Sequence, residues 1–256
     1  MIGAPGARPD PAAAGERADL SVGPRAVIDL HCHTNASFDS LASPSSVVEA
    51  AAARGLTHLA ITDHDRIDGA LRAREAAPGS LDVIVGEEVR TQEGDLICLF
   101  LEHPIPSGSP VRATIAAARE QGALVGIPHP FDRYRASLLM NDDLEGLADL
   151  VDWIETWNAR LVGRGGNERA ATFAHAHGLP GVAVSDAHSV LEVGMAHSLM
   201  NGDPTTPAGL RNALQTVAHG GASPADLAGT AGPIGRLVQR ARSAIGPTVN
   251  RSDPGQ

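Results

Sequence analysis

Lysine is absent from this 256-residue chain, so all 20 of its basic residues are arginines. Aromatic residues make up only 3% of the chain, and the only cysteines are Cys32 and Cys98. Two cysteines are too few for a disulfide scaffold, and both lie in apolar stretches that favour small buried side chains. No apolar run approaches the ~20 residues that span a bilayer, and no signal peptide is recognisable at the N-terminus. We therefore expect a cytoplasmic protein without membrane contact.

Acidic residues outnumber basic ones, and the formal net charge is −10. This balance argues against broad affinity for a phosphate backbone, so no long nucleic acid is expected as a partner. Neither a G-x-G-x-x-G run nor a Walker A loop follows an apolar stretch, which removes the common glycine-rich nucleotide sites. A chain of this length can bury a full core as one domain.

The composition divides the chain into three parts. Residues 1–24 are rich in Pro, Gly and Ala without periodicity and are expected to form a disordered tail. Residues 25–220 alternate between apolar runs and capped helical patterns and are expected to form one barrel domain. Residues 221–256 are expected to be an extension, with a possible terminal helix at 233–244 followed by a disordered tail.

Within the central part, short apolar runs and helical patterns take turns, which is typical of an α/β sheet with helices outside. The expected strands are 27–30, 59–62, 83–85, 96–100, 124–127, 153–156 and 182–184. The expected helices are 44–54, 68–77, 110–122, 141–150, 167–177 and 207–220. Ser43-Pro44, Ser109-Pro110 and Thr206-Pro207 each combine a capping side chain with proline at the first helical position, and Asp68 is expected to cap its helix. The alternation predicts a parallel sheet.

Imidazole or carboxylate side chains follow five of these runs. His31 and His33, two residues apart in extended chain, point to the same side, and neutral imidazole is a good ligand for divalent transition metals. The other runs end at Asp63-His64, Glu87-Glu88, His129 and Asp186-Ala187-His188. Because ligands come from so many strand ends, a closed barrel with its chemistry at the carboxyl face is favoured over an open sheet with one switch point.

These motifs, in this order, resemble those of the PHP (polymerase and histidinol phosphatase) family. The resemblance rests on the runs Asp29-Leu30-His31-Cys32-His33-Thr34, Ile61-Thr62-Asp63-His64-Asp65, Gly86-Glu87-Glu88-Val89, Pro128-His129-Pro130 and Ser185-Asp186-Ala187-His188. It implies a distorted seven-stranded (β/α)7 barrel that binds two or three divalent ions (Mn, Fe or Zn) at the carboxyl face of the strands. It also implies hydrolysis of phosphoesters.

The resemblance implies a set of metal ligands: His31, His33, Asp39, His64, Glu88, Asp95, His129, Asp186 and His188. Glu87 is the alternative to Glu88 as bridging carboxylate. Asp39 keeps the acid of a Ser-Asp-Gly turn whose neighbours differ here, and Asp95 stands where relatives often have histidine. The catalytic candidates are His64, Asp186 and His188, since either histidine could also protonate a leaving group.

Phosphate recognition favours arginine, whose planar fork donates two hydrogen bonds at once. Arg133 and Arg135 follow the run that ends before His129, and Asn158 and Arg160 follow the run at 153–156. These four are the candidate substrate-binding residues, although Asn158 could instead tie its own turn.

The leading hypothesis is a metal-dependent phosphoesterase acting on a small phosphomonoester or nucleotide through a metal-activated water. A second is an amidohydrolase-type C–N hydrolase, which also opens with His-x-His. Its usual bridging lysine is absent here. A third is a non-catalytic metal- or nucleotide-binding module. The pattern leaves the oligomeric state open.

Overall fold

The structure is a computed structural model, in which residues 25–135, 137–138, 146–161 and 165–221 are described. The expected tail at 1–24, nearly all of the expected extension at 221–256 and the predicted helix at 233–244 lie outside the described residues. The domain boundaries given above therefore stay predictions.

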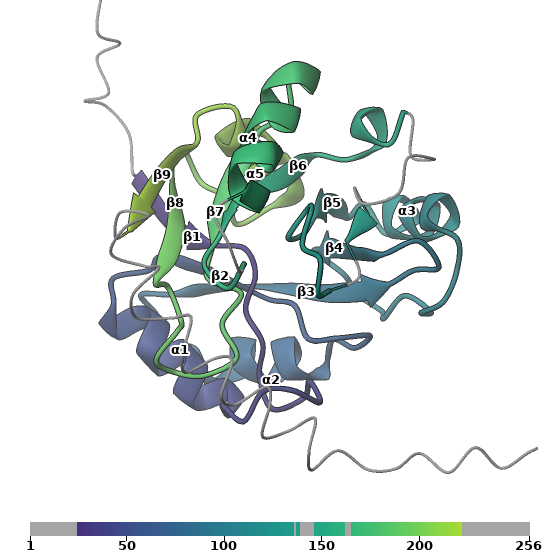
Figure 1. The fold of residues 1–256 in the computed structure, drawn as a ribbon. Coiled ribbons are helices and arrows are strands. Elements are labelled where there is room, and N and C mark those ends of the chain that lie inside the picture. The colour runs from purple at the N-terminus through teal and green to yellow at the C-terminus, as the bar shows by residue number, and fades with distance from the viewer. Residues whose placement is uncertain (1–24, 136, 139–145, 162–164, 222–256) are drawn as a thin grey trace, which may run out of the picture.

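The described residues form one nine-stranded sheet in the order β7-β6-β5-β4-β3-β2-β1-β8-β9. The strands are β1 (Arg25–Asp29), β2 (His58–Ile61), β3 (Asp82–Arg90), β4 (Asp95–Leu99), β5 (Leu124–Ile127), β6 (Trp153–Asn158), β7 (Gly181–Val184), β8 (Ala196–Asn201) and β9 (Ala218–Gly221). The helices are α1 (Pro44–Ala53), α2 (Asp68–Ala76), α3 (Val111–Glu120), the short 3-10 helix η2 (Ala148–Leu150), α4 (Gly165–His177) and α5 (Pro207–Leu214). Helices α1 and α2 lie together on one side of the sheet, and α3 lies on another (Figure 1).

The sheet curves into a nearly closed barrel, so the expected α/β barrel is confirmed (Figure 1). On β8, the hydroxyl of Ser198 accepts a 2.9 Å hydrogen bond from the amide of Ala183 on β7 and donates to its carbonyl at 3.1 Å. Farther along the seam, the Asp186 amide donates to the His31 carbonyl at 2.9 Å. Candidate ligands therefore lie on both sides of the closure.

The expected parallel pairing is found between β1, β2 and β3 and between β5, β6 and β7, but two strands depart from it. Strand β4 is antiparallel to both β3 and β5, and β8 is antiparallel to both β1 and β9. Only the turn at 91–94 separates β3 from β4, whereas a parallel pair needs a crossover of about a dozen residues. Because β4 runs backwards, its first residue, Asp95, pairs with Arg90 at the end of β3. The start of β4 thus lies at the edge where β3 ends.

Two helix starts follow the capping rules. Ser43 accepts a hydrogen bond from the Ser46 amide, and Thr206 accepts one from the Gly209 amide. Two other expected caps were wrong: α3 begins after Pro110 without a side-chain cap, and the Asp68 carboxylate binds arginines. The last helix ends at Leu214 rather than near 220, because the chain continues into β9. Of the helix expected at 141–150, only η2 lies among the described residues.

Apolar side chains form two clusters, one on each face of the sheet. The outer cluster packs α1, α2 and α3 against the strands, and the inner cluster fills the barrel with Ile28, Leu30 and Trp153. A Cβ on Gly126 would lie 2.0 Å from the Trp153 indole, so glycine on β5 makes the space for this ring. Leu210 and Leu214 of α5 complete the inner cluster.

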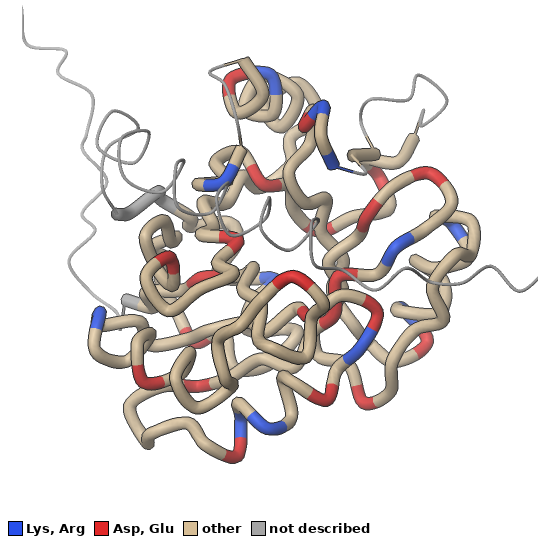
Figure 2. Tube along the Cα trace, turned by 60° about the horizontal axis from the view of Figure 1, so that its bottom comes forward, with Lys and Arg blue, Asp and Glu red and all other residues tan. Residues whose placement is uncertain are grey.

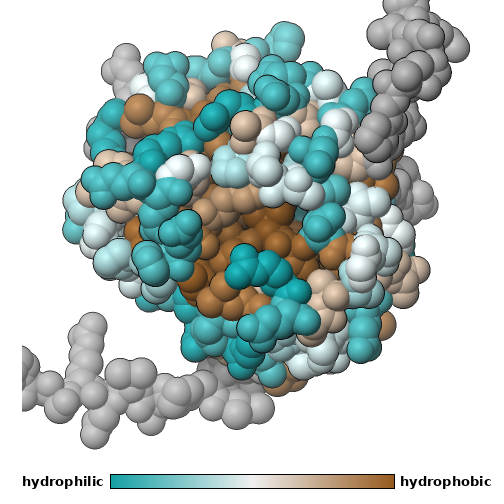
Figure 3. Space-filling model, turned by 180° about the vertical axis from the view of Figure 1, so that it is seen from behind, coloured by the Kyte–Doolittle hydropathy of each residue, from teal (hydrophilic) through white to brown (hydrophobic). Residues whose placement is uncertain are grey.

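Acidic and basic residues alternate along the described chain rather than gathering in one stripe (Figure 2). From behind, apolar side chains line a hollow that hydrophilic side chains surround (Figure 3). Among the described residues, none of the helices has the length and apolar character needed to cross a membrane.

Candidate metal centre

The structure brings all the predicted ligands together at the end of the barrel where β1, β2, β3, β5 and β7 finish. They form three groups whose ligand atoms lie within 4.8 Å of one another. The groups are His31, His33 and Asp186; His33, Asp39, His64 and His188; and Glu88, Asp95 and His129. The shared residue His33 links the first two.

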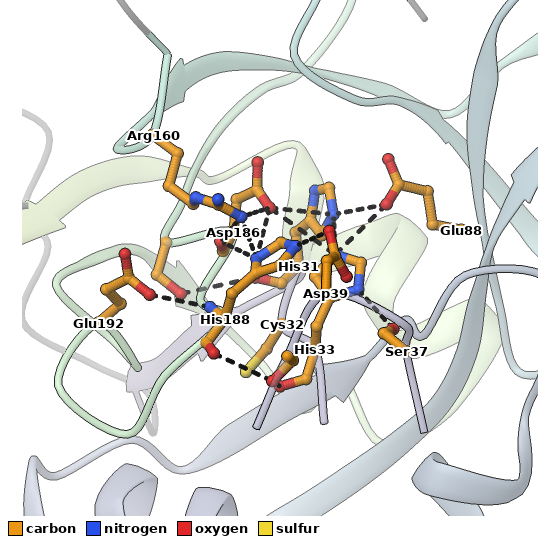
Figure 4. A network of polar contacts seen from close by, with 12 residues as sticks. His31, Cys32, His33, Ser37, Asp39, Glu88, Arg160, Asp186, His188 and Glu192 are labelled. Atoms are coloured by element: carbon orange, nitrogen blue, oxygen red, sulfur yellow. Dashed lines mark hydrogen bonds and ion pairs between the residues drawn. The ribbon is translucent and has the colours of Figure 1, made fainter. Parts of the chain in front are cut away.

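In the first group, the Nε2 atoms of His31 and His33 are 2.9 Å apart (Figure 4). The Asp186 Oδ1 atom lies 3.6 Å from the first and 3.7 Å from the second. All three side chains are buried. Two imidazole nitrogens and a carboxylate oxygen thus converge on one point.

In the second group, His188 Nε2 is 2.9 Å and His64 Nε2 is 3.5 Å from the same Asp39 oxygen. His64 is less buried than the others, and the exposed ring of Phe38 stacks on it with centroids 5.0 Å apart. A cleft of about 700 Å³ opens beside it, lined by His64, Asp65, Arg66, Ile67, Asp68, Leu71, Glu102, His103 and Pro104. His64 therefore lies between the ligand groups and open surface.

In the third group, the Glu88 carboxylate lies close to imidazoles of all three groups. Its Oε2 atom is 3.1 Å from His64 Nδ1 and 3.3 Å from His33 Nε2, and its Oε1 atom is 2.8 Å from His129 Nε2. Asp95 joins this group because β4 is antiparallel. Glu87 belongs to none of the groups, and its Oε2 atom accepts from the Ile105 amide at 2.9 Å. The geometry favours Glu88 over Glu87 as a shared ligand.

Backbone strain coincides with the cluster. His129 has φ 27° and Asp186 has φ 51°, values in the left-handed region that side chains with a Cβ seldom adopt. Such conformations cost about 1–3 kcal/mol each and persist only where surrounding contacts enforce them. Both residues lie where a strand ends, so the strain turns their side chains into the cluster.

The donor set fits divalent cations. Within the described part of the chain, Asp39 Oδ1 and Asp186 Oδ1 are buried without a hydrogen-bond partner. Buried carboxylate oxygens are seldom left unpaired, and each of these lies in a group that also offers imidazole nitrogens. Mixed imidazole and carboxylate ligands suit Mn, Fe or Zn.

Charges in the cluster are strongly coupled. Burial opposes protonation of His31, but the carboxylates of Asp186, Glu155 and Glu88 outweigh it and hold its pKa well above 6.5. Burial and the neighbouring His188 lower the pKa of His33 to about 4. Neighbouring groups thus shift the pKa values of these two imidazoles in opposite directions.

The carboxylates divide in the same way. Burial alone would raise the pKa of Asp186, but Arg135 and His31 hold it well below the ordinary value. Burial and the charge of Glu88 instead raise the pKa of Asp95 to about 6. Among the four predicted carboxylate ligands, Asp95, which departs from the family pattern, is therefore the one whose charged form is least favoured.

Three of the four predicted substrate-binding residues also converge on Asp186. Arg135 Nη1 donates to its Oδ2 atom, Asn158 Nδ2 donates to the same oxygen at 3.0 Å, and Arg160 Nη1 lies 3.7 Å from Oδ1. Arg160 also contacts His188 Nδ1 (Figure 4). Arg133 is exposed and, among the described residues, makes no contact with the cluster.

The sequence analysis missed several residues that hold the ligands in place. Ser37 bridges His33 Nδ1, at 3.0 Å, and the Asp63 carboxylate, at 2.7 Å. Glu192 accepts from the His188 amide at 3.0 Å, and Glu155 contacts His31. All three are buried, and for Glu155 and Glu192 the only signal in the sequence was an acid within a mostly apolar run.

Comparisons with known proteins agree with this class of metal-binding barrel. Residues 29–159 match the PHP domain family, and residues 164–216 match the PHP-associated family. The chain belongs to the PHP domain family.

Two relatives share about one third of their aligned residues with this chain. An uncharacterized protein of Methanocaldococcus jannaschii is 34% identical over 173 residues, which are 66% of this chain and 68% of the relative. A 5′-3′ exoribonuclease of Haemophilus influenzae is 34% identical over 121 residues, covering 42% of this chain and 44% of that enzyme. The likeness to this exoribonuclease thus spans less than half of either chain.

Among solved structures, a two-domain protein of Bacteroides vulgatus containing a predicted PHP-like metal-dependent phosphoesterase superposes with a TM-score of 0.65 at 19% identity. The match covers 78% of this chain and 65% of that one. A lesion-specific endonuclease of Pyrococcus furiosus superposes with a TM-score of 0.59 at 16% identity, over 78% of this chain and 60% of that one. At these identities the likeness establishes the fold alone.

Proposed function

We propose that this protein is a metal-dependent phosphoesterase that hydrolyses a small phosphomonoester or nucleotide. One observation carries the proposal: three ligand groups lie next to one another, with Glu88 in contact with residues of each, and two arginines approach Asp186 of the first group. Divalent ions bound there would act as Lewis acids and activate water for attack on phosphorus. Membership of the PHP family supports this reaction class.

The ligand roles follow from the groups. His31, His33 and Asp186 would hold one ion; Asp39, His64 and His188, with His33, a second; Asp95 and His129, with Glu88, a third. The number of ions, two or three, depends on whether Asp95 serves as a ligand. In this proposal His64, Asp186 and His188 face the reacting phosphate directly.

The arginines would bind the phosphate. Arg135 and Arg160 are mostly buried, and each has a guanidinium nitrogen beside Asp186. A phosphoryl group would accept hydrogen bonds from their remaining N–H groups in the bidentate manner that guanidinium favours. Asn158 orients Asp186, while Arg133, which is exposed, would act only on a substrate that extends beyond the cluster.

Two observations bear on the size of the substrate: the net charge of the chain and the volume of the cleft. The net charge of −10 disfavours long polyanions, and the cleft beside His64 offers about 700 Å³ for the part of the substrate beyond the phosphate. The named relatives include an exoribonuclease and an endonuclease, so an oligonucleotide end belongs in any test. We propose a small substrate on the balance of charge and cleft size.

The test is phosphate release by Mn²⁺-reconstituted protein from a panel of substrates. The panel holds histidinol phosphate, 3′,5′-bisphosphonucleotides, mononucleotides, a chromogenic aryl phosphate and a 5′-phosphorylated RNA oligonucleotide. The proposal expects chelator-sensitive release from a monomeric substrate and none from His31→Ala. Release of mononucleotides from the oligonucleotide alone would overturn the small-substrate part. No release from metal-loaded protein would overturn the reaction class and favour C–N hydrolysis or a binding role.

A further inference from the structure

Glu155 lies on β6 beneath the ligand groups and is not itself among the proposed ligands. Its side chain is 1% exposed, and both carboxylate oxygens have partners. Oε1 is 2.6 Å from His31 Nδ1, and Oε2 accepts from the His129 amide at 2.6 Å and from Asn158 Nδ2 at 2.8 Å. Three polar groups from different parts of the chain thus converge on one buried carboxylate.

We propose that Glu155 is a positioning residue: it fixes which nitrogen of His31 carries the proton and thereby couples metal binding in two of the ligand groups. This inference rests on the metal centre of the proposed function. Beyond that function, it gives Glu155 a role although this residue would contact neither metal nor substrate.

The first step concerns the two ring nitrogens of His31. A carboxylate can only accept a hydrogen bond, so its 2.6 Å contact with Nδ1 places the proton on that nitrogen. The lone pair of Nε2 is then directed at the point shared with His33 Nε2 and Asp186 Oδ1. Carboxylate partners of this kind orient metal-binding imidazoles and raise their basicity.

The second step concerns His129. Its amide donates to Glu155 Oε2, and its backbone has a φ of 27°, which needs support from its surroundings. The Nε2 atom of the same residue lies 2.8 Å from Glu88 Oε1 in another ligand group. One carboxylate thus holds His31 through the side chain and His129 through the backbone.

The third step concerns Asn158. Its Nδ2 atom donates to Glu155 Oε2 and, at 3.0 Å, to Asp186 Oδ2. The Glu155 carboxylate is therefore connected to Asp186 as well. No such contact joins Glu155 to Asp39, His64 or His188 within the described residues, so the group around Asp39 should depend on it least.

The test compares metal titrations of wild type, Glu155→Gln and Glu87→Gln by calorimetry with Mn²⁺ and Zn²⁺. Glutamine keeps the shape of Glu155 but offers one acceptor oxygen where three donors converge, so one donor must face an NH₂ group. We expect about 10–100-fold weaker binding at the sites served by His31 and His129, the range found when such partners of metal ligands are removed. Binding at the remaining site should stay within about twofold.

Glu87→Gln is the matched control, since Glu87 is equally buried, is adjacent to Glu88 and belongs to no ligand group. It should bind metal as wild type does. Wild-type affinity at every site in Glu155→Gln would overturn the proposal. So would an equal loss at all sites in a variant whose circular dichroism matches wild type.

A second measurement does not depend on Glu155→Gln. In Zn²⁺-loaded wild type, ¹H–¹⁵N correlation of the histidine rings should show His31 protonated on Nδ1, with the Nδ1–H signal lost in His31→Gln. Protonation on Nε2 would overturn the proposal even if Glu155→Gln fails to fold. Neither readout depends on turnover, so a failed phosphoesterase assay and a failed role for Glu155 give different results.

Discussion

The two ends of the barrel are built from the same strands but differ in the side chains that they bury. At the end where β1 and β7 finish, His31, His33 and Asp186 are buried together, and the backbone is strained at Asp186. Toward the other end, where β6 begins, Trp153 joins an apolar cluster that Leu210 of α5 completes. The apolar end stabilises the fold, whereas the polar end combines buried ionisable groups with strained backbone, a cost that bound cations would offset.

The largest effect should come from breaking the polar end. We expect Asp186→Ala to lower kcat/KM on the best substrate by more than about 100-fold, because loss of a ligand should exceed the 10–100-fold cost of losing a ligand's partner. Asp203→Ala, at an exposed carboxylate after β8, is the control and should keep wild-type turnover. Equal turnover in both variants would remove Asp186 from the site.

Breaking the apolar end should change stability. Trp153→Ala removes a buried indole that packs on Gly126, and we expect the free energy of unfolding to fall by about 3–5 kcal/mol. Urea unfolding of metal-free protein, followed by circular dichroism, measures this. Phe38→Ala, at a ring that is 78% exposed, should cost less than about 0.5 kcal/mol. A cost below about 1 kcal/mol for Trp153→Ala would contradict the division between the ends.

Glu87 lies beside the candidate ligand Glu88 on β3 but outside the ligand groups, so it shows what burial alone does to an acid there. Burial raises the pKa of Glu87 to about 7, so the folded state binds this proton more tightly than the unfolded state does. The resulting stability is present below pH 4.5 and is lost as pH rises through about 7. Glu87→Gln should abolish this loss, on the order of 1–3 kcal/mol, in unfolding measured from pH 4 to 8. An unchanged pH profile in the variant would show that Glu87 ionises freely.

The smallest effect is expected on the outside of the barrel, away from both ends. Arg72 pairs with Asp68 one turn earlier on α2, at 2.6 Å, and both side chains are about half exposed. Arg72→Ala should cost only about 0.3–0.5 kcal/mol, as exposed pairs at this spacing do. A loss above about 1 kcal/mol in thermal unfolding would show that this pair does more than neutralise an exposed helix face.

The fold was predictable where local signals decide it. The apolar runs gave each of the strands β1 to β7, and Ser43 and Thr206 marked two helix starts. Strand direction was not predictable from periodicity, because a hairpin and a parallel pair present similar runs. Strand β8 alternates between buried and half-buried positions and was not recognised as a strand. Its pairing with β1 is a long-range choice that no local pattern encodes.

The candidate site divides similarly. The ligand groups contain every residue expected from the ordered motifs, including Asp95, which reaches them only because β4 is antiparallel. Glu155 was missed because it lies inside an apolar run, where an acid gives no sign of its partners. Those partners, His31 and His129, come from other strands. The predicted metal ligands follow recurring sequence motifs. The residues that position those ligands, such as Glu155, can be identified only from the fold.

The most direct measurement is an anomalous difference map from a crystal soaked in Mn²⁺. We predict peaks at the ligand groups, one beside His31, His33 and Asp186 and another beside Asp39, His64 and His188. A further peak beside Asp95 would show that this departure from the family pattern still binds an ion. Ordered, Mn²⁺-soaked crystals without a peak at any of these groups would contradict the assignment of a metal centre to this end of the barrel.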